Sequence, residues 1–273
     1  MDLIVFDLDG TLLDGKSKVS DHTRETLRRL RDRNIAYTVA TGRTLHAARD
    51  LLDGHGFTLP HIFKNGVMTW RPEHDAFSHC SLLTLPEVGA ILESFAEVDV
   101  SPFIFTLEGE TDHTVYHPEL RSDTERELLR VFAKERGLKV VPQAALPGDA
   151  RITNISALGA KSAIEALATR VDDQPHLVAY AGTAIEGKGL HWIDVHHGEA
   201  SKGGAIAQLK QDLGVSRVIC FGDSDNDLSM FAMADEAYAP SNAKAPVLEA
   251  ATAVIGHHDE DGVSEFLRER FNL

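Results

Sequence analysis

Four consecutive apolar residues, Leu3 to Phe6, stand near the beginning of the chain and end abruptly at the polar sequence Asp-Leu-Asp-Gly. A short apolar run with β-branched members is typical of a strand that is buried on both faces. Such strands lie inside parallel sheets, which helices cover on both sides. This segment therefore predicts the interior of an α/β sheet, close to the start of the chain.

Helical and strand-like segments alternate after this run. Residues 21–33 have the spacing of an amphipathic helix, and residues 36–40 have the composition of a second strand. We expect the next helix to begin at Thr41 and to end near Gly54. Alternation of this kind is typical of a parallel sheet with helices on both faces.

The same alternation returns in the last third of the chain. The predicted helices there are 201–213, 243–250 and a last one from Gly262, with a loop and a helix over 222–233, and the predicted strands are 218–221, a segment around Tyr238, and 253–255. We therefore predict that both ends of the chain form one Rossmann-like core of the α/β class.

The segment between these two parts has another pattern. Amphipathic helices are predicted at 86–97, 122–136 and 161–171, and strand-like runs with one exposed face at 103–106 and 152–155. The chain has 273 residues, the length of roughly two domains. We expect an α+β domain at 83–188, inserted into a core made of 1–82 and 189–273.

Composition and charge exclude several classes of protein. Apolar residues make up 43 % of the chain and charged residues 25 %, as in ordinary globular proteins. No apolar run reaches the roughly 18 residues that span a bilayer, and the sequence opens on Asp2 rather than on a basic region followed by an apolar signal core, so we expect a cytoplasmic protein. The 42 acidic residues exceed the 27 basic ones by 15, which opposes binding to nucleic acid or to an anionic membrane.

Two smaller residue classes give no site. Cys80 and Cys220 are too few to hold a fold of this size together and are predicted to be packing thiols. The histidine doublets His196-His197 and His257-His258 are predicted to be loop residues without a metal. Metal ligands usually converge from several segments, which adjacent residues do not.

Two carboxylates follow the first predicted strand directly. Ligands of open α/β sheets bind at the carboxyl ends of the strands. Alternation along an extended segment would put Asp7 and Asp9 on one side and turn Leu8 away. One carboxylate could then act as a nucleophile while the other moves protons. An ordinary acidic turn would use the same residue types.

A second acidic cluster, residues 222–227, follows the predicted strand 218–221. An acidic helix start would also explain it. Together with the first cluster, however, it would collect about four negative charges with few basic residues nearby. Such a pocket raises carboxyl pKa values unless a cation neutralises it. Mg²⁺ binds through one or two carboxylates, water and phosphate oxygens, so we predict a magnesium site.

Two further residues are suited to a phosphate. At the predicted start of a helix, Thr41 would offer a hydroxyl and backbone amides to an anion. The helix dipole disfavours Lys202 at the start of its helix unless an anion lies close by. The alternatives are a helix cap for Thr41 and a solvated surface residue for Lys202.

The order of these motifs resembles that of the haloacid dehalogenase (HAD) superfamily of phosphatases. The four matching motifs are Asp7-x-Asp9-Gly10-Thr11, Thr41-Gly42-Arg43, Lys202-Gly203 and Gly222-Asp223-x-x-Asn226-Asp227. The long insert is similar to a class IIB cap of the Cof-type branch, as are Asn65-Gly66, Ser241-Asn242-Ala243 and Asp261-Gly262-Val263. The resemblance implies the HAD fold and Mg²⁺-dependent hydrolysis of small phosphomonoesters, foremost sugar phosphates or similar metabolites.

The resemblance also implies the roles of the four catalytic residues. Asp7 would form an aspartyl-phosphate, and Asp9 would protonate the leaving oxygen and then activate water. Thr41 would hold a phosphoryl oxygen, and Lys202 would neutralise both Asp7 and the transferred group.

Ligands of metal and substrate follow from the same resemblance. Mg²⁺ would be held by Asp7, the backbone carbonyl of Asp9, and Asp223, with Asp227 orienting this shell. The implied substrate contacts are Gly42, Arg43, Asn65 and Asn226, although Arg43 could simply be exposed on its helix. Lys64 departs from the family pattern, and it could bind a second acidic group of the substrate or face water.

Two alternatives to a hydrolase remain open. A phosphotransferase such as a mutase would use the same aspartyl-phosphate, and a receiver-like signalling module would carry a stable phospho-aspartate. A receiver needs about half this length and has no proton-handling residue such as Asp9. The expected partner is a small phosphorylated metabolite, with no nucleic acid and no membrane, and the expected state is a monomer or homodimer.

Overall fold

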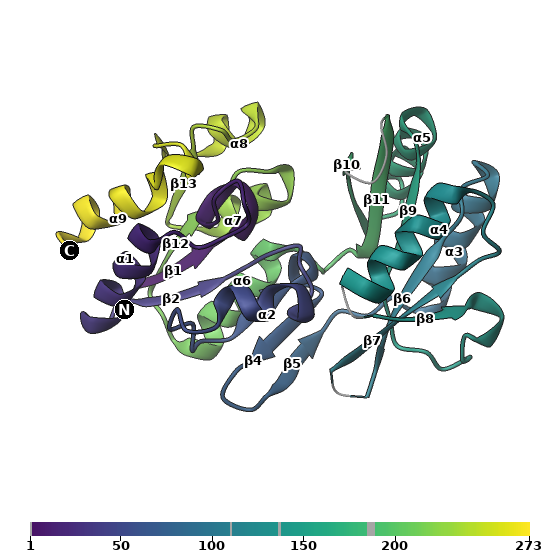
Figure 1. The fold of residues 1–273 in the computed structure, drawn as a ribbon, viewed down its shortest axis with the longest axis horizontal. Helices are drawn as coiled ribbons and strands as arrows, with labels where there is room; N and C mark the ends of the chain where they lie inside the picture. Colours follow the sequence, from purple (N-terminus) through teal and green to yellow (C-terminus); the bar gives the residue numbers. More distant parts are fainter. Residues whose placement is uncertain (1, 110, 136–137, 185–188) are drawn as a thin grey trace. The chain divides into compact units, whose positions relative to one another are not determined.

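The computed structural model describes residues 2–109, 111–135, 138–184 and 189–273. The chain forms two compact units (Figure 1). The core unit is Met1–His79 with Ser201–Leu273, and the insert unit is Cys80–Ala200. The boundary that we expect at residue 188 lies outside the described residues, so the separate folding of 83–188 stays a prediction.

The main sheet of the core unit has five parallel strands in the order β14-β13-β12-β1-β2. They are β14 (Ala253–Ile255), β13 (Glu236–Pro240), β12 (Arg217–Phe221), β1 (Asp2–Phe6) and β2 (Ala36–Val39). Because β1 lies between β12 and β2, the carboxyl ends of strands from both ends of the chain are neighbours. The predicted α/β core is confirmed.

Burial of β1 on both faces is also confirmed. Ile4 and Phe6 pack into one apolar cluster with the helices at residues 21–32, 45–52 and 262–271, while Leu3 and Val5 pack into a second cluster with the helices at 202–213, 228–233 and 245–250. All four side chains are fully buried, and each stabilises the fold by roughly 1.5–3 kcal/mol. The apolar run is continuous because neither face of the strand meets water.

The helices of the core unit begin and end close to the predicted positions, with one exception. They are α1 (Asp21–Asp32), α2 (Leu45–Leu52), α6 (Lys202–Leu213), α7 (Leu228–Met233), α8 (Ala245–Ala250) and α9 (Gly262–Phe271). Ser201 caps α6, and Gly214 ends it with a φ of 62°, a conformation that glycine adopts without strain. Within the described residues, no helix is both long and apolar enough to cross a membrane.

The exception is the helix start that we predict at Thr41, which is wrong. Helix α2 begins at Leu45, because the Thr44 side chain accepts a hydrogen bond from the backbone N–H of Ala47 and caps it there. The backbone of the preceding residues pairs across a loop instead. Thr41 N–H donates to Ile62, and the Thr41 carbonyl accepts from the N–H of Asn65.

A small antiparallel sheet follows this loop in the core unit. Its strands are β3 (His61–Phe63), β4 (Met68–Arg71) and β5 (Ala76–Cys80), in that order. A 3-10 turn at Lys64–Gly66 joins β3 to β4. Both Lys64 and Asn65 have positive φ values, of 48° and 55°.

The insert unit contains a six-stranded sheet in the order β10-β11-β9-β6-β7-β8, antiparallel except between β7 and β8. Its strands are β6 (Phe103–Glu108), β7 (Asp112–His117), β8 (Lys139–Pro142), β9 (Ile152–Ala160), β10 (Leu177–Thr183) and β11 (Leu190–His197), and its helices are α3 (Leu85–Glu97), α4 (Asp123–Arg130) and α5 (Lys161–Asp172). This mixture is the predicted α+β architecture.

Two details of the insert differ from the prediction. The helix predicted at 122–136 is α4 followed by a π-helical turn, Val131–Glu135. The exposed face predicted for the runs 103–106, in β6, and 152–155, in β9, is wrong, because all residues of both runs are buried. Ile104 packs against α3 and α5, and Phe103 packs on the other face against Phe132.

Candidate active site

Asp7 lies where the central strand ends. Its N–H donates to the carbonyl of Phe221 at 2.9 Å, which extends the pairing of β1 with β12 by one residue. Leu8 then turns into the core and is fully buried, as predicted. At Gly10, φ is 76°, and a Cβ atom there would lie 2.5 Å from Asp223 Oδ2. The turn after β1 therefore requires glycine, and it packs directly against the second acidic cluster.

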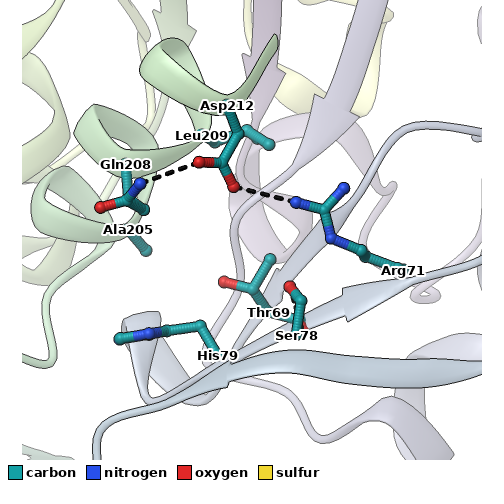
Figure 2. A pocket seen from close by; sticks show the side chains of 8 residues that line it. All are labelled: Thr69, Arg71, Ser78, His79, Ala205, Gln208, Leu209 and Asp212. Carbon is teal, nitrogen blue, oxygen red and sulfur yellow. Dashed lines mark hydrogen bonds and ion pairs between the residues drawn. The ribbon is translucent and has the colours of Figure 1, made fainter.

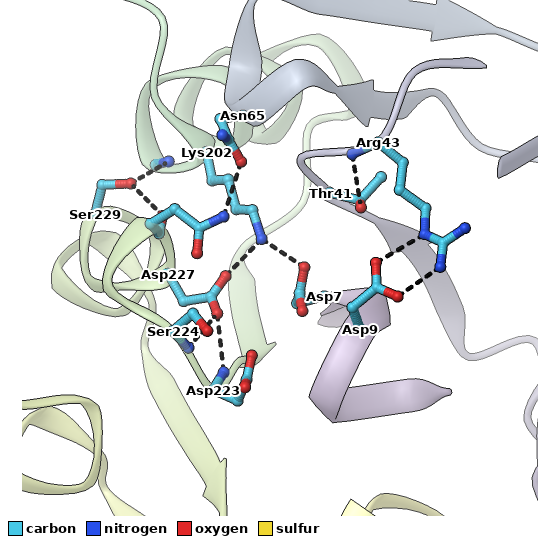
Figure 3. A network of polar contacts seen from close by, with 12 residues as sticks. Asp7, Asp9, Thr41, Arg43, Asn65, Lys202, Asp223, Ser224, Asp227 and Ser229 are labelled. Atoms are coloured by element: carbon cyan, nitrogen blue, oxygen red, sulfur yellow. Dashed lines mark hydrogen bonds and ion pairs between the residues drawn. The ribbon is translucent and has the colours of Figure 1, made fainter. Parts of the chain in front are cut away.

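Lys202 is fully buried between two carboxylates (Figure 3). Its Nζ donates to Asp7 Oδ1 and to Asp227 Oδ1, both at 2.6 Å. Burial alone would lower the pKa of Lys202, but the charges of Asp227 and Asp7 outweigh it and raise the pKa. The alternative of a solvated surface lysine is wrong, since these carboxylates supply the anions that its position requires.

Asp227 orients the second acidic loop. It is fully buried, and its Oδ2 accepts hydrogen bonds from the backbone N–H groups of Asp223 at 2.8 Å and Ser224 at 2.9 Å. Since Oδ1 accepts from Lys202, both oxygens of Asp227 are already bonded. This residue is therefore suited to holding the loop and Lys202 in place.

The acidic residues offer a site for a divalent cation. Carboxylate oxygens of Asp7, Asp223 and Asp227 lie within 4.8 Å of one another. Asp223 Oδ1 is buried and has no hydrogen-bond partner in the described part of the chain. Burial and the nearby Asp227 raise the pKa of Asp223 to about 6. An oxygen-only donor set that includes the buried, unsatisfied Asp223 Oδ1 fits Mg²⁺, which would use Asp7 and Asp223 as ligands.

The protonation of Asp7 depends on the same charges. Burial raises its pKa well above the usual value, against the opposing effect of Lys202, and Asp227 and Asp223 raise it further. A nucleophilic carboxylate must be ionised. A dication beside Asp7 would lower its pKa and so favour the ionised form, because opposite charge stabilises a carboxylate.

Arg43 binds Asp9 with two parallel hydrogen bonds (Figure 3). Its Nε donates to Asp9 Oδ2 at 2.7 Å, and its Nη2 donates to Oδ1 at 2.6 Å. The expectation that few basic residues lie nearby is thus wrong. Lys202 and Arg43 together reduce the four predicted site carboxylates to a formal charge of −2, which one Mg²⁺ would balance.

Thr41 and two amides line the neighbouring loop. The buried Thr41 Oγ1 accepts from Arg43 N–H at 3.1 Å, so its own hydroxyl proton stays available for a phosphoryl oxygen. Asn226 Nδ2 donates to Asn65 Oδ1 at 2.8 Å. A Cβ atom at Gly42 would lie 3.1 Å from the same oxygen of Asn65. These residues are brought together as predicted, whereas their contacts with a substrate stay predictions.

The turn at Lys64–Gly66 packs against the start of α6. A Cβ atom at Gly66 would lie 2.2 Å from the carbonyl oxygen of Ser201, the cap of that helix. Lys64 is buried and 5 % exposed, so the alternative that it faces water is wrong. That Lys64 binds a second acidic group of the substrate stays a prediction.

Asn242 is a site residue to which the sequence pattern assigned no role. Its Nδ2 donates to the carbonyl of Gly10 at 2.8 Å, and its Oδ1 accepts from His258 N–H at 3.1 Å. It therefore ties the turn after Asp7 to the C-terminal part of the core unit. The signal in the sequence is the Ser241-Asn242-Ala243 segment, which marks the residue but does not show what it contacts.

The histidine doublets lie in different environments. His196 and His197 belong to strand β11, so their prediction as loop residues is wrong. His257 and His258 lie at a short turn, where atoms of both rings and of Asp259 fall within 4.8 Å of one another. His258 Nδ1 donates to the carbonyl of Leu13 at 2.8 Å, a structural contact that needs no metal.

A separate pocket lies on the core unit between α6 and strands β4 and β5 (Figure 2). Its arginine, Arg71, bonds Asp212 at 2.9 Å, and Gln208 bonds the other oxygen of Asp212 at 2.8 Å. Arg71 is thus already neutralised. None of the predicted site residues lines this pocket, so the acidic cluster at the end of β1 is the better candidate.

A family model described as haloacid dehalogenase-like hydrolase matches residues 4–267. Among curated proteins, the chain is 28 % identical to the 5-amino-6-(5-phospho-D-ribitylamino)uracil phosphatase YwtE of Bacillus subtilis, over 98 % of this chain and 97 % of that protein. It is also 28 % identical to the HMP-PP phosphatase of an Enterobacter species, over 97 % and 94 %. Both are phosphatases by name.

Solved structures show the same fold. A haloacid dehalogenase-like hydrolase from B. subtilis has a TM-score of 0.79 at 24 % identity, covering 98 % of this chain and 99 % of its own. A structure described as a HAD subclass IIB sugar phosphatase has a TM-score of 0.77 at 20 % identity, covering 100 % and 99 %. Because both comparisons cover at least 98 % of this chain, the shared fold includes the insert unit.

Proposed function

Because this chain belongs to the haloacid dehalogenase-like hydrolases, we propose that it is a phosphatase of small phosphorylated metabolites with Asp7 as its nucleophile. The observation that carries the proposal is the fully buried Lys202, held between Asp7 and Asp227 at the end of the central strand. A buried cation at a helix start is costly without such partners. Besides pairing with these carboxylates, Lys202 is placed to stabilise negative charge that develops on a group transferred to Asp7.

In the first step, a carboxylate oxygen of Asp7 attacks phosphorus. A bond forms between Asp7 and phosphorus, and the bond from phosphorus to the leaving oxygen breaks. Asp9, in its acid form, gives its proton to the leaving oxygen, and an alcohol departs. Thr41 and Lys202 offer an O–H and a positive charge to the phosphoryl oxygens, since such transfers depend mainly on positioning and charge neutralisation.

In the second step, Asp9 is a carboxylate and takes a proton from water. The water oxygen attacks phosphorus, the bond between phosphorus and Asp7 breaks, and phosphate departs. Asp9 is again in its acid form, and one water has been consumed for one alcohol and one phosphate. Asn226 Oδ1, buried and unbonded within the described ranges, is suited to accept a hydrogen bond from water near the site.

The acidic residues would hold Mg²⁺. Asp7, Asp223 and the backbone carbonyl of Asp9 are the proposed ligands, and Asp227 orients them through the loop that it bonds. When bound, the ion supplies positive charge to phosphoryl oxygens and keeps Asp7 ionised. The unpartnered Asp223 Oδ1 and the raised pKa of Asp223 support this assignment.

The relatives support a class of substrate but not one particular compound. Their names support a small phosphorylated compound here, and the phosphoribityl group in one of the names supports a phosphomonoester. We favour a sugar phosphate or a similar metabolite, and a cytoplasmic location, as in the sequence-based expectation. A screen of phosphorylated metabolites with and without Mg²⁺, compared by kcat/KM, identifies the substrate.

The Asp7→Asn variant tests the nucleophile. We expect it to lose Mg²⁺-dependent release of phosphate, because an amide cannot form the covalent intermediate. Asp225→Asn is the matched control, since Asp225 lies in the second acidic loop but bonds the exposed Lys244 at 2.7 Å. Near-full activity of Asp7→Asn would refute the proposal. Isomerisation of a sugar phosphate without free phosphate, followed by NMR, would instead indicate a mutase.

A further inference from the structure

We infer that Arg43 is a positioning residue that fixes the Asp9 carboxylate for proton transfer, rather than a contact for the substrate. The inference rests on the proposed function, in which Asp9 is the acid and base. It differs from the sequence-based expectation, which placed Arg43 with the substrate contacts. Three features of the structure support it.

The first feature is the exposure of Asp9. Its side chain is 53 % exposed, so packing does not hold it in one rotamer. Among the described residues, the contacts to its carboxylate come from Arg43, at 2.6 and 2.7 Å. A bidentate contact with a guanidinium fixes both the position and the plane of a carboxylate. Without it, the exposed carboxylate would be free to change rotamer.

The second feature is that Arg43 is itself held in place. Its Nη1 donates to the carbonyl of Ala47 at 3.3 Å, its N–H donates to Thr41 Oγ1, and its carbonyl accepts from Lys64 N–H at 3.0 Å. A guanidinium has five N–H groups, and three are used by Asp9 and Ala47. Arg43 thus joins Asp9 to the loop of Thr41, and few of its donors remain for a substrate.

The third feature is the separation of the two carboxylates. Figure 3 shows the Asp7 carboxylate facing Lys202 and the Asp9 carboxylate facing Arg43, although the two residues are only two apart in the chain. Each carboxylate therefore has a cation of its own. Arg43 keeps Asp9 away from the Lys202 ammonium, which leaves Lys202 for Asp7 and the transferred group.

The contact is compatible with proton transfer. The two oxygens of a carboxylate offer about four lone-pair positions, and Arg43 uses one on each oxygen. One position on each oxygen stays available for the proton that passes to the leaving oxygen or comes from water. Asp9 can therefore act as acid and base while Arg43 holds it.

The test compares two substrates that differ in their need for an acid. The leaving group of p-nitrophenyl phosphate departs without a proton, whereas that of an alkyl phosphate such as glycerol phosphate requires one. For Arg43→Ala, we expect kcat on the alkyl phosphate to fall about 100-fold, as for loss of a general acid, with a much smaller fall on p-nitrophenyl phosphate. KM should change little for either substrate.

Four further variants give the inference its controls. Asp9→Asn should show the same dependence on the leaving group, and the double variant should be no slower than Asp9→Asn alone, because both act on one step. Arg43→Lys should restore little of the lost kcat, since an ammonium group cannot make two parallel hydrogen bonds to one carboxylate as a guanidinium does. Arg49→Ala should behave as the wild type, because Arg49 is an exposed arginine on α2 whose nearest acid is 3.9 Å away.

Different failures have different meanings. If Arg43→Ala raises KM equally for both substrates and leaves kcat unchanged, Arg43 binds substrate and the inference is overturned. If Asp9→Asn shows the dependence on the leaving group and Arg43→Ala does not, the inference fails alone. If Asp9→Asn itself shows no such dependence, the role of Asp9 in the proposed function fails, and the inference falls with it.

Discussion

The site contains two kinds of charge pair. Lys202, Asp7 and Asp227 form a triad in which all three side chains are buried, the most exposed at 8 %. Arg43 and Asp9 form a pair that is 24 % and 53 % exposed. Buried ions are costly unless every charge is compensated, whereas an exposed pair contributes about 0–1 kcal/mol. The triad therefore couples catalysis to stability, while the pair affects catalysis with little effect on stability.

The largest effect is expected when the cation of the triad is removed. Lys202→Met leaves Asp7 and Asp227 buried without compensation, which should destabilise the fold by about 3–5 kcal/mol and abolish phosphate release. Urea unfolding and a phosphate assay measure the two effects. Lys210→Met on the same helix is the control, because Lys210 forms a partly exposed pair with Asp235. Equal losses for both variants would show that burial of Lys202 is unimportant.

His61 is a third case, in which the effect of burial outweighs that of the nearby acid Glu73. Burial lowers the pKa of His61 to about 4, so between pH 6.5 and 4 the unfolded chain binds a proton that the folded protein does not. Stability from this residue is present at neutral pH and is lost as the pH falls through this range, by about 3 kcal/mol in total. His61→Phe should reduce the loss measured by urea unfolding between pH 7 and 4. An unchanged pH profile would contradict this pKa.

Magnesium should stabilise the protein through the same buried carboxylates. At 100 times its dissociation constant, Mg²⁺ should add about 2.7 kcal/mol to the free energy of unfolding, and EDTA should reverse the gain. The increase in melting temperature should be lost in Asp223→Asn and kept in Asp225→Asn. If Asp223→Asn responds to Mg²⁺ as the wild type does, Asp223 is not a ligand.

The smallest effect on stability is expected for the exposed pair. Arg43→Ala should lower the free energy of unfolding by less than about 1 kcal/mol, although it slows the reaction of an alkyl phosphate. Thermal or urea unfolding of this variant beside Lys202→Met gives the direct contrast between pair and triad. A loss as large as that of Lys202→Met would mean that Arg43 supports the fold of the loop and is not mainly a positioning residue for Asp9.

Local patterns predicted the scaffold well. The apolar run of β1 and the Gly214 at the end of α6 depend on short stretches of sequence, and both lie as predicted. The prediction that helix α2 begins at Thr41 was wrong, because Thr41 and Thr44, three residues apart, are both residues that cap helices well. Pairing of the Thr41 loop with Ile62 and Asn65, which are distant in the chain, decided between them.

By itself, the sequence determined the α/β core, the inserted unit, the family and the acidic residues at the strand ends, because periodicity and ordered motifs are local properties. Only the tertiary structure decided how the charges are paired. It joined Lys202 to Asp7 and Asp227, and Arg43 to Asp9, across 195, 25 and 34 residues. Electrostatic energy depends on distance and burial in three dimensions, so the same five charges in another arrangement would have other pKa values and other roles.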